Sequence, residues 1–510
     1  MSDTSYSPRD RERLPYAGWT DGAHGNAAST VKASLSRKLM WHLVRSIASL
    51  ASVVGAAVSL ERLTPPRGVP RMQITITRSM VVALLLASSA ALRAEEWPHW
   101  RGPAGSGVSP EARLPHQWSD THNTSWRAPL AGVGVSSPIV WKDRVIVTSQ
   151  SGSGGSRVGP RLGQGADASA GERGLVARQD SGVRFAIEAL SAADGKRQWI
   201  YELAAEGSLP AVHDKHNLAS ASPVTDGDRV YAVFGTGQVV AVDAAGQVVW
   251  TRHLGQEHGA WAIIWGNGSS PIVHRGALIL MCLQGSTSYL LALDGRTGKP
   301  LWKTDRPGGT TSYSTPLVVS GPVGDELIVN SSLGVEAYDP ASGSLLWYFN
   351  EPNQFPVPVA VYHDGVIYLS RGHRSGPYAA IRPGGRGDIS KTHVLWHVPT
   401  GAPYISSLVY YDGLLYMAGD TGIVTCVDAK TGERVWRERL GGIYTASPVA
   451  GDGKIYLMSE TGETIVLKAG RTPEVLSRNQ ISGRVLASPA ISNGRLFIRT
   501  DEHVVAVGGQ

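Results

Sequence analysis

The sequence predicts an all-β protein, an eight-bladed β-propeller of four-stranded antiparallel blades whose ring is closed by the N-terminal strand. Two repeated patterns predict this fold. One is an eleven-residue frame that begins with a small residue, passes through Asp and Gly, and ends in Trp. The other is a Ser-Pro or Thr-Pro step that opens an alternating strand. The two patterns stay in phase along most of the chain, so each pair marks one blade.

The frame is clearest at residues 292–302, Ala-Leu-Asp-Gly-Arg-Thr-Gly-Lys-Pro-Leu-Trp, and it describes a hairpin. An apolar strand ends at Asp, Thr-Gly makes a turn in which Gly is free to take a positive φ, and a second strand carries the Trp. One hairpin cannot bury an indole, so we expect the Trp to dock between blades. Seven Trp residues mark such units: Trp126, Trp199, Trp250, Trp302, Trp347, Trp396 and Trp436. Truncation of Trp302 is expected to cost about 3–5 kcal/mol, and that of Trp97 less.

The second pattern supplies eight strand starts. Six are clear, and the degenerate copies are Val357-Pro358-Val359 and Ser406-Ser407-Leu408. The starts stand at Ser137, Ser222, Ser270, Thr315, Val357, Ser406, Ser447 and Ser488, separated by 85, 48, 45, 42, 49, 41 and 41 residues. Asp-Gly turns follow several of them, as at residues 364–365 and 412–413. A sandwich of ordinary hairpins is the alternative architecture.

Ring closure follows from the two ends of the chain. Trp126 precedes the first start, whereas the chain ends soon after the eighth, with a strand at 503–507. Because a closed ring leaves no open sheet edge, the segment around Trp126 is predicted to complete the last blade. The seventh frame, near residues 467–476, lacks its Trp. The first interval is lengthened by an insertion at 151–181 that is rich in Gly, Ser and Arg, for which we expect a mobile loop within blade 1.

The N-terminal region differs in composition from the repeats. Residues 1–71 are rich in Ser, Arg, Gly and Pro and are predicted to be disordered or to derive from an upstream start. Residues 72–94 combine a basic start with an apolar run and small residues, which is the pattern of a signal peptide. The propeller is then expected to span 95–510. The protein is therefore predicted to be exported, to the periplasm or beyond.

Charge and cysteine content limit the classes of function and the covalent links that the chain is expected to have. Residues 1–94 carry 12 Lys and Arg against 5 Asp and Glu, so the other 36 basic and 37 acidic residues nearly balance. A near-neutral chain does not favour nucleic-acid binding. Cys282 and Cys426 fall in different units, so a disulfide between them is not expected. Cys426 takes the small-residue position of its frame and is interpreted as a buried apolar side chain.

These repeats resemble the pyrroloquinoline-quinone-repeat family of eight-bladed propellers, with its docking motif Ala-x-Asp-x-x-Thr-Gly-x-x-x-Trp. The resemblance covers residues 97–510, and the opening Trp-x-x-Trp-Arg-Gly-Pro is similar to the start of secreted bacterial members. The family includes quinoprotein alcohol dehydrogenases with a calcium-bound quinone and the cofactor-free propeller subunit of the outer-membrane β-barrel assembly machine. The dehydrogenases place an adjacent Cys-Cys pair against the quinone, and this sequence has none.

The expected function is therefore binding or scaffolding in the bacterial envelope, without a catalytic residue, metal or cofactor. A monomer with a protein, peptide or glycan partner is predicted, and a quinoprotein oxidoreductase using pyrroloquinoline quinone and calcium is the alternative. The resemblance places a ring of aromatic residues at one mouth of the central funnel, where aromatic groups suit recognition: Trp261, Trp265, Tyr313, Tyr404 and Tyr444. The run His213-Asp214-Lys215-His216 holds ligand-type residues but is interpreted as an exposed loop.

Overall fold

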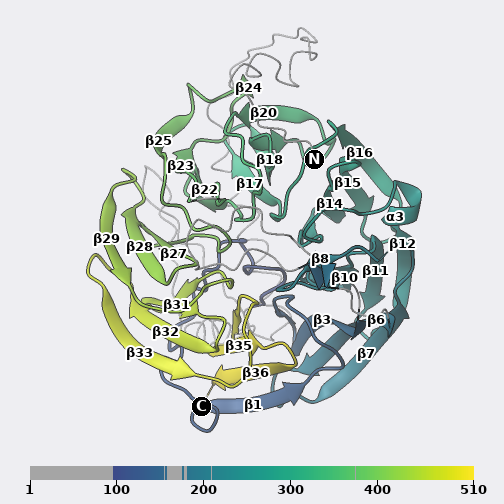
Figure 1. Cartoon of the computed structure of the whole chain (residues 1–510), viewed down its shortest axis with the longest axis horizontal. Helices are drawn as coiled ribbons and strands as arrows, with labels where there is room; N and C mark the ends of the chain where they lie inside the picture. Colours follow the sequence, from purple (N-terminus) through teal and green to yellow (C-terminus); the bar gives the residue numbers. More distant parts are fainter. Residues whose placement is uncertain are drawn as a thin grey trace, which may run out of the picture. The chain divides into compact units, whose positions relative to one another are not determined.

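The computed structural model describes residues 96–153, 156–157, 175–176, 181–207, 209–373 and 375–509. The predictions for residues 1–94 lie outside these residues, as does most of the 151–181 insertion. The described chain forms eight antiparallel sheets arranged as the blades of a ring (Figure 1). The predicted eight-bladed propeller is confirmed.

Each blade runs outward from a short inner strand. Blade 1 consists of β2 (Ile139–Trp141), β3 (Arg144–Ser153), β6 (Ser181–Ser191) and β7 (Arg197–Ala204), and blade 2 of β9 (Val224–Thr225), β10 (Arg229–Val233), β11 (Gln238–Asp243) and β12 (Val248–His253). Blade 3 consists of β13 (Ile272–His274), β14 (Ala277–Leu283), β15 (Ser288–Asp294) and β16 (Pro300–Arg306). Blade 4 consists of β17 (Leu317–Gly321), β18 (Gly324–Asn330), β19 (Val335–Tyr338) and β20 (Leu345–Phe349).

Blades 5 to 8 repeat the arrangement. Blade 5 consists of β21 (Val361–His363), β22 (Val366–Ser370), β23 (Tyr378–Ile381) and β25 (Val394–Val398), and blade 6 of β26 (Val409–Tyr411), β27 (Leu414–Ala418), β28 (Ile423–Asp428) and β29 (Arg434–Arg439). Blade 7 consists of β30 (Val449–Gly451), β31 (Lys454–Met458), β32 (Glu463–Lys468) and β33 (Glu474–Gln480). Blade 8 consists of β34 (Ala490–Ser492), β35 (Arg495–Arg499), β36 (His503–Gly508) and β1 (Thr124–Pro129). The short helix α3 (Leu254–Glu257) follows blade 2.

Four short strands lie outside this plan. Strand β24 (Gly387–Asp388) pairs in parallel with β20 and adds a fifth strand to blade 4. Strands β4 (Ser156–Arg157) and β5 (Leu175–Val176), the described parts of the blade 1 insertion, form a small sheet with β8 (Val212–His213). The insertion is therefore tied to the connection between blades 1 and 2.

The repeated frame is a docking device between blades. In each complete frame the small residue faces the Trp across the outer strand pair, as Ala292 faces Trp302, and a β-bulge follows. The Trp302 indole N–H donates to the Pro340 carbonyl of blade 4 at 3.0 Å. A Cβ added at Gly343, the turn glycine of blade 4, would lie 2.4 Å from the same indole. Gly343 has a φ of +71°, so both its backbone conformation and its lack of a side chain are required.

The degree of burial differs among the Trp residues. Trp347 has no exposed surface, because β24 pairs alongside it and its N–H donates to Glu326 at 2.8 Å. Trp302 is partly buried and packs against the core between blades 3 and 4. Trp97 is 1% exposed and pairs with Val140 of blade 1, which favours a larger cost for its truncation than its place outside the repeats predicts. The sequence gives no sign of this burial, since Trp97 stands outside the repeats.

The ring closes as predicted. Strand β1 pairs with β36, with Trp126 opposite Ala506, and Figure 1 shows the purple β1 lying along the yellow β36. The small residue of this frame thus comes from the other end of the chain. In blade 7, Ser477 replaces the Trp opposite Val466. Trp118 of the N-terminal segment, 4% exposed, stacks on Tyr456 of that blade at 6.3 Å and supplies the missing aromatic group.

Two strand starts need correction. Where the Ser or Thr step is clear, the first strand of the blade begins two residues after it. The first strands of blades 5 and 6 begin at Val361 and Val409, so the equivalent step residues are Val359 and Ser407. The predicted starts at Val357 and Ser406 are therefore two residues and one residue early. The error arose because Val357-Pro358 imitates the Ser-Pro step, whereas Val359-Ala360 has no such signal.

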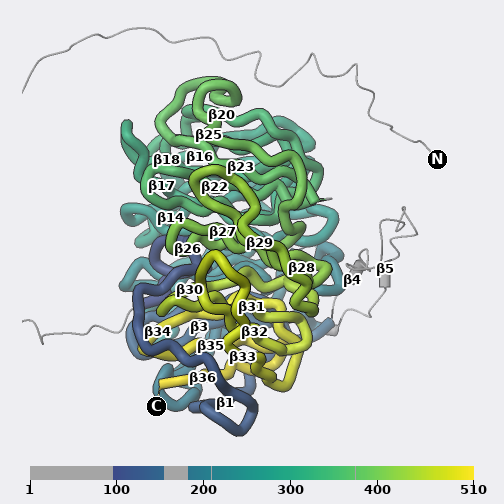
Figure 2. The backbone as a smooth tube through the Cα atoms, turned by 90° about the vertical axis from the view of Figure 1, so that its left-hand side faces the viewer, coloured from purple at the N-terminus to yellow at the C-terminus, as the bar shows by residue number. Residues whose placement is uncertain are grey.

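A segment at residues 97–111, the crossing segment, spans the ring from blade 1 to blade 8. Trp97 pairs with Val140, the Pro98 carbonyl accepts from Thr225 of blade 2, and the Arg101 guanidinium donates to the Leu408 carbonyl of blade 6. Figure 1 shows this purple segment at the centre of the ring, and Figure 2 shows it on the side of β30 and β34. It therefore passes over one end of the central channel.

Candidate functional site

The candidate site is the funnel pocket, a cavity of about 230 Å³ where the inner ends of the blades meet. The residues that line it come from the crossing segment, the connections between blades and the strand starts. They are Trp100, Val135, Ser137, His213, Lys215, His216, Ser220, Ser222, Trp265, Gly268, Ser270, Tyr313, Thr315, Phe355, Val357, Tyr404, Ile405, Thr445, Ser447, Leu486, Ala487 and Ser488. Trp100 belongs to the crossing segment, so that segment closes one end of the funnel.

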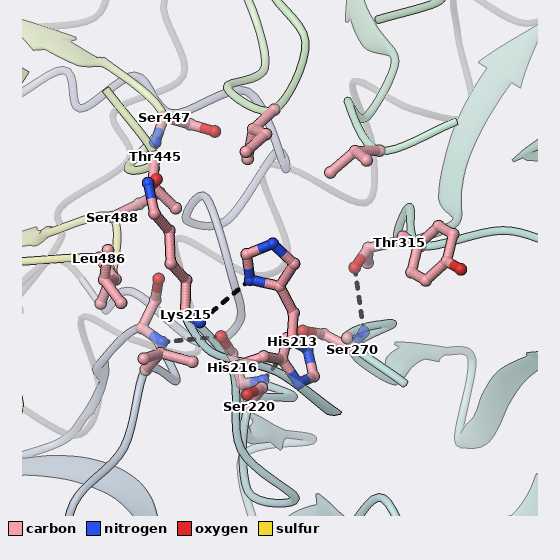
Figure 3. Close-up of a pocket in the computed structure, with 18 of the residues that line it drawn as sticks. His213, Lys215, His216, Ser220, Ser270, Thr315, Thr445, Ser447, Leu486 and Ser488 are labelled. Atoms are coloured by element: carbon pink, nitrogen blue, oxygen red, sulfur yellow. Dashed lines mark hydrogen bonds between the residues drawn. The ribbon is translucent and has the colours of Figure 1, made fainter. Parts of the chain in front are cut away.

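Hydroxyl groups form an inner ring that links neighbouring blades. The backbone N–H of Ser222 donates to the Ser270 Oγ at 2.9 Å. That of Ser270 donates to the Thr315 Oγ1 at 3.0 Å, the dashed bond between these two labelled residues in Figure 3. The same bond joins Ser447 to Ser488 at 2.9 Å. The Ser-Pro step is thus explained: the hydroxyl accepts from the preceding blade, and Pro occupies a position ahead of the inner strand.

The connection between blades 1 and 2 contributes the polar side of the pocket. Strand β8 brings in His213, whose backbone N–H donates to the Trp265 carbonyl at 3.0 Å. Lys215 extends toward Thr445, as Figure 3 shows, and its Nζ lies 2.7 Å from the Glu460 carboxylate of blade 7. The Thr445 hydroxyl donates to the same carboxylate at 2.5 Å. This ion pair ties the connection between blades 1 and 2 to blade 7.

The sequence predicts an exposed loop at His213 and His216, but the structure places both histidines in the wall of the pocket. A Cβ added at Gly268 would lie 3.0 Å from the His216 ring. Burial, and to a smaller extent the neighbouring His213, lowers the pKa of His216 to about 4. Burial also lowers the pKa of His213. Both rings are therefore neutral at pH 7, which suits hydrogen bonding inside a cavity.

A second acidic group lies close to the ion pair. Burial raises the pKa of Asp420 to about 6, backbone N–H groups and Lys215 oppose this rise, and Glu460 adds to it. Asp420 and Glu460 occupy the same turn, between the second and third strands, in blades 6 and 7. Lys215 thus lies close to two carboxylates, those of Glu460 and Asp420.

The aromatic residues predicted at the funnel mouth divide into two groups. Trp265, Tyr313 and Tyr404 line the funnel pocket. Trp261 and Tyr444, at 4% and 1% exposure, pack into the cores of neighbouring blades. Phe355 and Trp100 also line the pocket and were missed, because neither belongs to a repeated pattern.

A calcium-bound quinone does not fit this set of side chains. Calcium takes six to eight oxygen ligands, usually including carboxylates, and no Asp or Glu is among the described residues that line the funnel pocket. The described part of the chain also contains no group of three or more His, Cys, Asp or Glu residues able to hold a metal ion. Cys282 and Cys426 are free and buried in different cores.

Comparison with known proteins places the chain among related propellers. Residues 112–287, 183–355, 388–471 and 420–508, together more than half of the chain, match a family model described as outer membrane protein assembly factor BamB. Tetrathionate hydrolase from Acidithiobacillus ferrooxidans is 25% identical over 62% of this chain and 60% of its own length. The assembly factor BamB from Burkholderia pseudomallei is 33% identical over 22% of this chain and 29% of its own. The chain thus spans less than two thirds of either relative.

Solved structures share the fold. Quinohemoprotein alcohol dehydrogenase from Comamonas testosteroni superposes with a TM-score of 0.57 at 14% identity, covering 83% of this chain and 82% of its own. At this identity the likeness concerns the fold alone. Across the described residues, no helix is long and apolar enough to cross a membrane.

Proposed function

We propose that this chain, which belongs to the family of PQQ-like β-propellers, is a binding protein of the bacterial envelope that holds a partner in its funnel pocket. The observation that carries the proposal is the pocket itself, which collects side chains from around the whole ring and is closed at one end by Trp100. At about 230 Å³ it is smaller than the roughly 300–1,000 Å³ of sites for drug-sized ligands. It therefore suits one side chain of a peptide, a sugar unit or a small organic molecule.

Envelope localisation is part of the proposal. The signal-peptide pattern at 72–94 supports export, and the match to a family of outer membrane assembly factors supports an envelope partner. The activity named for tetrathionate hydrolase is not carried over, because the match leaves a large part of that protein uncovered. The absence of carboxylates among the described pocket residues favours binding over the quinoprotein alternative.

Site-specific photocrosslinking tests the proposal. A benzophenone amino acid is placed at Phe355, which lines the pocket, and as a control at Leu301, which is exposed on the outer strand β16. In cells that produce the full chain, we expect a discrete adduct from position 355 that Trp265→Ala weakens, and no such adduct from position 301. Equal adducts from both positions, or none from position 355, would contradict binding in the funnel.

A further inference from the structure

We propose that the funnel pocket selects a ligand with a carboxylate head on an apolar or aromatic body. The inference rests on the proposed function, since it names the chemical class of the ligand bound in the same pocket. It follows from the balance of hydrogen-bond donors and acceptors in the lining, from its charge, and from the aromatic wall.

The inner ring offers donors without protein acceptors. In Ser222, Ser270, Thr315, Ser447 and Ser488, the hydroxyl oxygen already accepts a backbone N–H from the neighbouring blade. A hydroxyl has one proton to donate, and no acceptor for these five protons is found among the described residues. The side chains are at most 7% exposed. Because a buried donor without an acceptor costs about 1–3 kcal/mol, the ring favours a ligand rich in acceptor oxygens.

The charge of the lining also favours a ligand that carries a carboxylate. Lys215 is the single permanently charged side chain among the described residues that line the pocket. Its ammonium group has three donors, and Glu460 Oε1 takes one of them. Glu460 also receives the Thr445 hydroxyl and lies 4.0 Å from Arg484. The contact with Glu460 fixes the ammonium group and leaves two of its donors for a ligand oxygen.

The rest of the wall is apolar. Trp265, Tyr313, Phe355 and Tyr404 lie around the pocket, and Trp100 closes its end. Aromatic faces bind flat or branched apolar groups through area burial and stacking. A carboxylate held by Lys215 and the hydroxyl ring would leave the body of the ligand against these faces. The donors therefore select for the carboxylate head of the ligand, and the apolar wall selects for its apolar or aromatic body.

Calorimetric titration of the full chain with three probes tests the charge preference. 3-Phenylpropionate, 3-phenylpropionamide and phenethylammonium share an aromatic body and differ in the head group. We expect the carboxylate to bind at least about tenfold more tightly than the amide, because charge-assisted hydrogen bonds are roughly twice as strong as neutral ones. The ammonium probe is expected not to bind measurably.

A pair of double variants assigns the effect to Lys215. Lys215→Met/Glu460→Gln removes both members of the ion pair of the pocket, so neither partner is left behind as an unpaired charge. Lys468→Met/Glu474→Gln removes an exposed pair of the same blade, whose Nζ–Oε2 distance is 3.0 Å. The first variant is expected to lose the preference for carboxylate over amide, and the second to keep it. Thermal unfolding of both variants checks that the blades remain folded.

The outcomes separate the inference from the proposed function. Equal binding of carboxylate and amide, or tighter binding of the ammonium probe, overturns the carboxylate preference while leaving a binding funnel. A lack of binding by all three probes overturns the inference, and the crosslinks from position 355 then decide independently whether the funnel binds a partner. Peptides that end in Phe, as the free acid or as the amide, show whether the natural ligand is a peptide or a small molecule. Tighter binding of the free-acid peptide than of 3-phenylpropionate identifies the C-terminus of a chain. Tighter binding of 3-phenylpropionate identifies a small organic acid.

Discussion

Replacing Trp347 by Ala tests the docking of indoles between blades. The Trp347 side chain is fully buried, and an indole of this kind buries about 150–250 Å². At about 25 cal/mol per Å² its removal costs about 4–6 kcal/mol, in line with the roughly 3–5 kcal/mol typical of Trp→Ala in a core. Glu326 also loses a donor at 2.8 Å, although the Gly384 N–H at 2.9 Å remains. We therefore expect a total loss of about 5 kcal/mol in the free energy of unfolding.

Trp302→Ala is the internal comparison. Trp302 is partly buried, so its truncation loses a smaller share of the apolar transfer energy than that of Trp347, about 3–4 kcal/mol. Leu301→Ala, at a neighbouring position that is 55% exposed, serves as the control and is expected to change stability by less than about 0.5 kcal/mol. Urea denaturation followed by tryptophan fluorescence and circular dichroism measures all three. Equal losses for Trp347→Ala and Trp302→Ala, or a loss as large for Leu301→Ala, would refute docking as the source of stability.

Four further outcomes follow from the structure. Trp97→Ala should destabilise the protein by about 3–5 kcal/mol in the same urea assay, since Trp97 is 1% exposed; a loss below that of Trp302→Ala would contradict its place in the core. Deleting residues 95–130 should unpair β36 and cause aggregation, measurable by light scattering, whereas a monomeric fragment with an unchanged denaturation midpoint would refute ring closure. The pKa of His216 is lowered to about 4, so the unfolded chain binds more protons and stability should fall as pH falls from about 6.5 to 4, a slope that His216→Asn should reduce. The pKa of Asp420 is raised to about 6, so its contribution has the opposite sign, and Asp420→Asn should remove a loss of stability that develops as pH rises from about 4 to 6.

The repeated patterns were enough to predict the architecture. The frame at 292–302 predicted its hairpin, its turn glycine and the docking of Trp302, because each depends on local backbone conformation and on one large side chain. The strand starts were located to within two residues, with errors where Val357-Pro358 imitates the repeat. Ring closure by the segment of Trp126 was also predictable, since a propeller leaves no blade incomplete.

The site depended on tertiary structure. Trp265, Tyr313 and Tyr404 could be named from their place before a strand start, but Trp261 and Tyr444 hold similar places and are buried in blade cores. Whether such a side chain faces the funnel or the neighbouring blade depends on contacts that sequence spacing does not encode.

Contacts between distant parts of the chain decided the rest. Trp118 fills the position that blade 7 leaves empty, and the crossing segment brings Trp100 beneath the funnel. Lys215 meets Glu460 across 245 residues of sequence. None of these residues belongs to the repeated frame or the Ser-Pro step, so no local pattern marks them. Only the closed ring brings the two ends of the chain and the opposite blades to the same cavity, and for that reason the pocket is a property of the folded protein.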